Sequence, residues 1–146
     1  WIVKLIDVYP NDTAAPEPNP AGVSMGGYQQ LVRAEVMRGR FRNSFEKPEP
    51  FVPNQPTRIR IELLDVLHRF TKGHRIMIQI QSTWFPLIDR NPQKFMKIHT
   101  ARREDYQKAI HRVYHAPGRA SRITLHVRST AARPGESADA ARGAVR

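Results

Sequence analysis

The sequence predicts an all-β fold, an antiparallel sandwich, from three observations. Several segments alternate apolar and polar residues with period two, the pattern of strands that bury one face. The 12 prolines in 146 residues favour loops and strand ends and argue against long helices. Strands do not alternate with helical segments, so a parallel sheet is not predicted.

The chain length fits one domain with a hydrophobic core. We predict that this domain spans residues 1–128. Residues 129–146 are small, polar and Ala-rich, without apolar periodicity, and we predict a disordered tail there.

The clearest strand signal lies in residues 74–82 and is followed by an aromatic corner. Ile76, Ile78 and Ile80 alternate with polar or longer side chains, and Gly73 supplies a turn before them. Pro86 cannot donate a ladder hydrogen bond, so strand pairing should stop by Trp84 and Phe85.

After this corner comes a polar turn, Asp89-Arg90-Asn91, ahead of Pro92. Such a turn favours side-chain-to-backbone hydrogen bonds and one ion pair. We define the corner motif as Trp84, Phe85, Pro86, Asp89, Arg90 and Asn91. It is interpreted either as a structural corner that closes the sandwich, or as a surface that docks on a partner domain and walls its pocket, since aromatic and arginine residues are enriched at interfaces.

The remaining elements follow from local pattern. Residues 1–9 are almost entirely apolar and should form a central strand covered on both faces. The other predictions are a surface loop over 11–21, a strand from 28 that ends near Gly39, an extended proline-rich connection over 41–56, a strand over 57–66 with a bulge at Leu63-Leu64, a short helix over 101–108, and two strands over 109–115 and 121–128.

One catalytic motif occurs in the sequence. Gly22-Val23-Ser24-Met25-Gly26 matches the G-x-S-x-G nucleophile elbow, which needs a buried strand before the serine and a helix after it. Here a proline-rich loop precedes Ser24 and a strand-like run follows it. We therefore interpret Ser24 as a weak candidate nucleophile and the motif as a flexible glycine loop.

No metal site or cofactor is predicted. His111 and His115 are four residues apart, a spacing that could share a metal on a helix, but their segment is strand-like. On a strand the two side chains would stand about 13 Å apart, too far for one ion. The sequence has no cysteine, which removes disulfides and thiolate ligands.

The formal net charge of +11 permits a polyanionic or acidic partner. A basic sandwich that binds nucleic acid is one alternative, on charge alone. Few exposed aromatics are interleaved with the arginines, and single-strand binding needs aromatic stacking platforms. Nucleic acid is therefore the less favoured partner. No membrane span or signal peptide is predicted, and no cellular compartment is assigned.

Four stretches together resemble the C-terminal non-catalytic domain of the CocE/NonD hydrolase family, which includes X-Pro dipeptidyl-peptidases and cocaine esterases. They read WIVKLIDVYP, GGYQQLVRAEVMRGRFRNSFEKPEPFVP, GHRIMIQIQSTWFPLIDRNPQ and HRVYHAPGRASRITLHV. The Arg42 to Pro48 segment looks most like the branch of α-amino acid ester hydrolases and glutaryl-cephalosporin acylases.

The resemblance implies a galactose-binding-like jelly roll, packed on an α/β-hydrolase domain whose Ser, Asp and His perform acyl transfer. None of those three residues maps onto this chain, so we expect it to be inactive alone. The catalytic domain is the implied partner, and a homo-oligomer is compatible with it. A jelly roll has eight strands, whereas six are predicted here, so we also expect that the first strands are missing.

Overall fold

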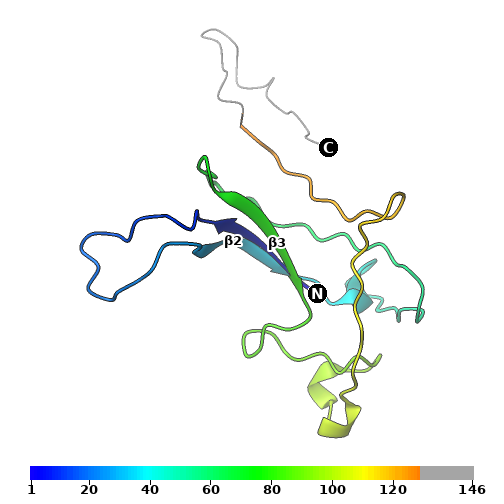
Figure 1. The fold of residues 1–146 in the computed structure, drawn as a ribbon. Coiled ribbons are helices and arrows are strands. Elements are labelled where there is room, and N and C mark those ends of the chain that lie inside the picture. The colour runs from blue at the N-terminus through cyan, green and yellow to red at the C-terminus, as the bar shows by residue number, and fades with distance from the viewer. Residues whose placement is uncertain (129–146) are drawn as a thin grey trace. The chain divides into compact units, whose positions relative to one another are not determined.

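The computed structural model describes residues 1–128, which divide into one unit over Trp1–Lys108 and a second that starts at Ala109. The first unit contains three strands, β1 (Ile2–Val8), β2 (Gln29–Val36) and β3 (Arg75–Gln81) (Figure 1). Its helical elements are three 3-10 turns, η1 (Gly39–Phe41), η2 (Ile98–Thr100) and η3 (Arg103–Asp105). No helix within the described residues is long and apolar enough to cross a bilayer.

The three strands form one antiparallel sheet in the order β2-β1-β3. Ile2 faces Val36 on one side and Gln81 on the other, and Val8 faces Gln29 and Arg75. This arrangement confirms the all-β antiparallel class and the central position of the first strand. The strand of residues 74–82 is therefore an edge strand in this sheet.

A β-bulge interrupts the pairing of β1 with β2. Leu5 pairs with Arg33 and the next residue, Ile6, pairs with Leu31, so Val32 is the extra residue. The bulge predicted at Leu63-Leu64 is wrong, because residues 57–66 do not form a strand.

The buried hydrophobic core consists of Ile2, Leu5, Ile6 and Val8, all on β1. Within the 41–56 connection, one phenylalanine is anchored and another is not. Phe51 packs edge-on against Trp1 with ring centroids 5.4 Å apart. Phe45 stays largely exposed.

Four further predictions of regular structure are wrong. Residues 57–66, 109–115 and 121–128 form no strand apart from an isolated bridge at His126, and the helix over 101–108 is reduced to η3. A period-two pattern indicates which face of a segment could be buried. A strand forms, however, only where a neighbouring strand can hydrogen-bond to its backbone. The described residues supply only one sheet, so the second layer and the jelly-roll order stay predictions. The predicted tail over 129–146 lies outside the described residues.

Candidate functional site

The corner motif begins directly after β3, where Trp84 is anchored to the sheet. The Lys4 ammonium of β1 lies 4.1 Å from the centroid of the Trp84 ring, within the range of a cation–π contact. The Ile88 N–H donates to the Trp84 carbonyl at 2.9 Å and turns the chain back. The corner is therefore held by the central strand as well as by its own turn.

Arg90 lies between two aromatic rings. Its guanidinium carbon is 5.0 Å from the Phe85 centroid and 5.7 Å from the Tyr106 centroid. Phe85 is 61% exposed and Tyr106 is 41% exposed. The corner thus presents an arginine flanked by two rings at the surface, the composition that is enriched where proteins bind proteins.

The polar part of the motif makes one hydrogen bond of the predicted kind, but its ion pair has a different partner from the one expected. Asp89 pairs with the distant Arg38, with 3.0 Å between a carboxylate oxygen and a guanidinium nitrogen, and not within the turn, and this pair ties the corner to the segment after β2. Asn91 Oδ1 accepts a hydrogen bond from the Gln93 N–H at 3.0 Å. Asp89 is thereby committed to Arg38.

Tyr106 is positioned by η3, which is capped by Asp105. The Asp105 carboxylate accepts from the Arg102 N–H at 2.9 Å and from the Lys94 ammonium at 3.1 Å. The backbone N–H of Arg102, followed by Lys94, lowers the pKa of the Asp105 carboxyl from its ordinary value. This cap fixes the ring that flanks Arg90.

A cluster that sequence analysis missed lies at the far end of β1. Asp7 is only 2% exposed, and its two carboxylate oxygens meet His68 Nε2 at 2.9 Å and His74 Nδ1 at 2.8 Å. The signal was present in the sequence, because a charged residue inside an apolar strand requires polar partners once it is buried. The cluster therefore holds two segments against the central strand: the irregular segment of residues 57–72, through His68, and the start of β3, through His74.

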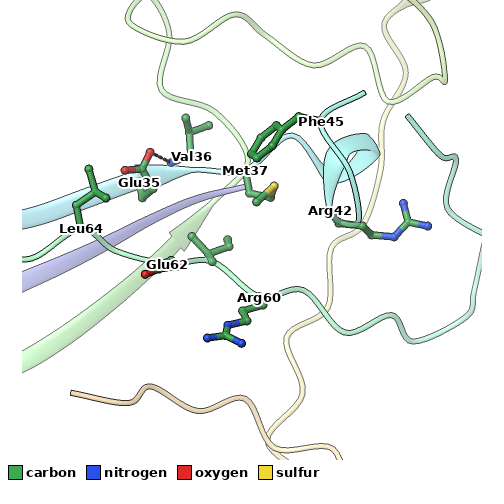
Figure 2. Close-up of a pocket in the computed structure, with 9 residues that line it drawn as sticks. Glu35, Val36, Met37, Arg42, Phe45, Arg60, Glu62 and Leu64 are labelled. Atoms are coloured by element: carbon green, nitrogen blue, oxygen red, sulfur yellow. Dashed lines mark hydrogen bonds between the residues drawn. The ribbon is translucent and has the colours of Figure 1, made fainter. Parts of the chain in front are cut away.

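The structure also contains an open pocket of about 390 Å³ beside β2. Figure 2 shows Phe45 and Met37 on one side and the segment with Arg60 and Glu62 on the other. The pocket is lined by Glu35, Val36, Met37, Arg42, Phe45, Arg60, Ile61, Glu62 and Leu64. Arg42 is held by Glu49 and the Gly39 carbonyl, and Glu35 accepts from the Val36 N–H. The pocket is thus lined by both apolar and charged side chains.

Ser24 lies in an exposed loop that leads into β2, with no helix after it. The motif's second glycine has a structural reason: a Cβ on Gly26 would collide with the Asn11 backbone carbonyl. Gly22 adopts φ +62°, which favours glycine. The glycines therefore serve loop geometry, and the interpretation of Ser24 as a non-catalytic residue stays a prediction.

The histidines considered for metal binding lie in the second unit. His111 and His115 are both exposed and outside any strand. Among residues 1–128, no group of three His, Asp or Glu side chains is arranged to hold a metal ion.

Three neighbouring arginines of the first unit contact their own surroundings. Arg38 pairs with Asp89, Arg42 with Glu49, and Arg40 donates to the Met96 carbonyl and stacks on Phe95. The positive charge is therefore partly used in local structure.

Comparison with solved structures finds two hydrolases that share this fold. An aminopeptidase from the marine sediment archaeon Thaumarchaeota archaeon is 47% identical with a TM-score of 0.64, and the match covers 73% of this chain and 17% of that one. An α-amino acid ester hydrolase is 44% identical, with the same TM-score and the same coverage of each chain.

Comparison with curated proteins gives a cocaine esterase from Rhodococcus sp. (strain MB1 Bresler), 27% identical over 127 residues. The match covers 87% of this chain and 20% of the esterase, so the chain spans about a fifth of this relative's length. The family model of the X-Pro dipeptidyl-peptidase C-terminal non-catalytic domain matches residues 1–124. The chain therefore belongs to this family of non-catalytic C-terminal domains.

Proposed function

We propose that this domain packs on an α/β-hydrolase catalytic domain of a longer polypeptide and helps to shape it. The longer protein would be a serine hydrolase that cleaves ester or amide bonds, with its catalytic triad outside this chain. The observation that carries the proposal is the match to a non-catalytic domain family across residues 1–124, in a chain that spans about a fifth or less of relatives named as esterase, ester hydrolase and aminopeptidase.

The corner motif supports a docking role. Lys4 contacts its Trp84 ring and Arg38 pairs with its Asp89, so the turn is anchored to the first unit. The side chains of Phe85 and Leu87 are exposed. Burying such apolar surface against a partner would be favourable, and apolar side chains that lie together at the surface are typical of interaction sites. In the proposed assembly the corner motif lies against the catalytic domain.

Labelling with a fluorophosphonate tests where the nucleophile lies. In the full-length protein we expect one labelled serine, outside residues 1–146, and unchanged labelling after Ser24→Ala. The isolated 146-residue chain should neither take up the label nor turn over p-nitrophenyl esters. Labelling of the chain that disappears with Ser24→Ala would overturn the proposal.

Docking is tested separately by activity of the full-length protein. Phe85→Ala removes an exposed ring that would be buried between the domains, and kcat/KM for a p-nitrophenyl ester should fall several-fold. Phe45→Ala is the matched control, because Phe45 is also largely exposed but lies at the pocket beside β2. Equal activities of the two variants and the unsubstituted protein would count against docking through the corner.

A further inference from the structure

Arg90 is held in place by stacking, but within residues 1–128 its side chain makes no hydrogen bond. The rings of Phe85 and Tyr106 flank the guanidinium, and within residues 1–128 it meets no carboxylate or carbonyl acceptor. Its neighbour Asp89 is taken by Arg38. By contrast, Arg38, Arg40 and Arg42 each donate to an oxygen in the first unit.

A stacked guanidinium with free edges is suited to an anion that presents two oxygens. The aromatic faces restrict the plane of the group, so less side-chain entropy is lost when it binds. The N–H groups then form a planar fork that matches the two oxygens of a carboxylate. If a partner covers the two rings, water is displaced from the pair and the pair becomes stronger.

We propose that Arg90 binds a carboxylate, an Asp or Glu side chain, on the catalytic domain of the longer protein. This inference rests on the proposed function and names the contact that would orient the two domains. The formal net charge of +11 makes an acidic partner surface complementary. Phe85 and Tyr106 would form the apolar border of the same contact.

Zero-length cross-linking in the full-length protein tests the contact directly. Arg90→Lys places an amine at this position, and a carbodiimide joins an amine only to a carboxylate in direct contact, with loss of water. We expect a cross-link from position 90 to an Asp or Glu outside residues 1–146, located by mass spectrometry. The yield of this cross-link should be at least tenfold higher than the yield of an interdomain cross-link from the control variant Arg58→Lys.

The matched control is Arg58→Lys. Arg58 is exposed and makes no ion pair, hydrogen bond or ring contact within residues 1–128. A cross-link from position 90 only to carboxylates within residues 1–146, or a yield equal to that of Arg58→Lys, would overturn the inference.

Charge reversal separates recognition from simple structural support. Arg90→Glu should lower kcat/KM by roughly tenfold or more, the loss typical of an interfacial arginine that faces a carboxylate. Reversing the identified carboxylate to arginine in the same protein should restore most of the activity. No restoration would mean that Arg90 acts only within its own domain.

The outcomes distinguish this inference from the proposed function. If Phe85→Ala lowers activity but position 90 gives no interdomain cross-link, the domains dock without the Arg90 contact. If Ser24 proves to be the nucleophile, the proposed function itself fails. If Arg90→Leu instead abolishes salt-sensitive binding to heparin and Arg58→Leu does not, the ligand is a polyanion and the inference is wrong.

Discussion

Asp7 is the buried charged residue of the part of the chain that the structure describes, and both of its oxygens are used. A buried carboxylate is tolerated only when hydrogen bonds replace the water it has lost. His68 and His74 supply these bonds from two segments far away in sequence. The hydrogen bonds that offset the burial of the carboxylate therefore also link distant segments of the chain to the sheet.

Asp7→Asn should weaken this constraint while preserving side-chain shape. The amide nitrogen cannot accept a hydrogen bond, so one histidine loses its carboxylate acceptor, and a bond to a charged group contributes about 2 kcal/mol, or roughly 30-fold in local opening. Hydrogen exchange of the Ile2–Val8 amides in the full-length protein should accelerate by that factor. Asp65→Asn, at an exposed position, should leave exchange unchanged. Equal exchange in both variants would show that the cluster does not stabilise β1.

The Asp105 side chain makes a pH-dependent contribution to the stability of the fold. Its pKa is lowered in the folded chain by the Arg102 N–H and Lys94. The folded carboxyl therefore stays ionised below the pH at which the unfolded one is protonated, and its stabilising effect is full above the unfolded pKa and disappears as pH falls through the folded pKa.

We expect η3 to loosen only in acid, below the ordinary pKa of an aspartate. In an NMR pH titration, the Asp105 side-chain carboxyl should titrate below the ordinary pKa of an aspartate. Asp105→Asn should remove the acid-dependent change in the Tyr106 ring signals. A midpoint for Asp105 at or above the ordinary aspartate pKa would contradict the cap.

At the scale of elements, the sequence predicts the strands that find partners within the described residues. β1, β2 and β3 carry strong apolar patterns and pair with one another. Residues 57–66 have an equally clear alternation of Ile59, Ile61 and Leu63, but no neighbouring backbone pairs with them. Periodicity encodes a face to bury, whereas pairing depends on chain that is distant in sequence.

The candidate site, like the fold, was predictable from the sequence only where it depends on neighbouring residues. The Asn91 turn follows from local residue chemistry and is present. The stacking of Tyr106 on Arg90 and the pairing of Arg38 with Asp89 depend on tertiary structure, so no spacing in the sequence could indicate them.

The loop between β1 and β2 provides a test at the element scale. Gly26→Ala places a methyl group against the Asn11 carbonyl, and backbone cannot move aside as a side chain can. We expect a loss of about 1 to 3 kcal/mol, as for other overpacking substitutions, seen as faster hydrogen exchange across residues 10–28. Gly22→Asn, at a position with φ +62° and open space, should be tolerated because asparagine adopts this conformation readily.

At the scale of the whole molecule, the buried residues of the described part of the chain all lie on the central strand except Pro92. Leu31, Leu67, Ile76 and Ile80 are exposed, although large apolar side chains on or beside a sheet are normally covered. Both β2 and β3 are also edge strands within the described residues. Exposed apolar faces and open edges together favour association with further chain.

The isolated 146-residue chain should therefore bind an apolar dye and self-associate, whereas the full-length protein should do neither through these residues. We expect ANS fluorescence and light scattering to rise with concentration of the isolated chain. Ile80→Lys places a charge on the β3 edge strand, where it opposes strand pairing between copies, and should reduce scattering. Lys108→Arg keeps the charge outside the sheet and should leave scattering unchanged. A monodisperse monomer that does not enhance ANS fluorescence would mean that the three-stranded sheet is stable without a covering layer, and the domain would then not need its partner in order to fold.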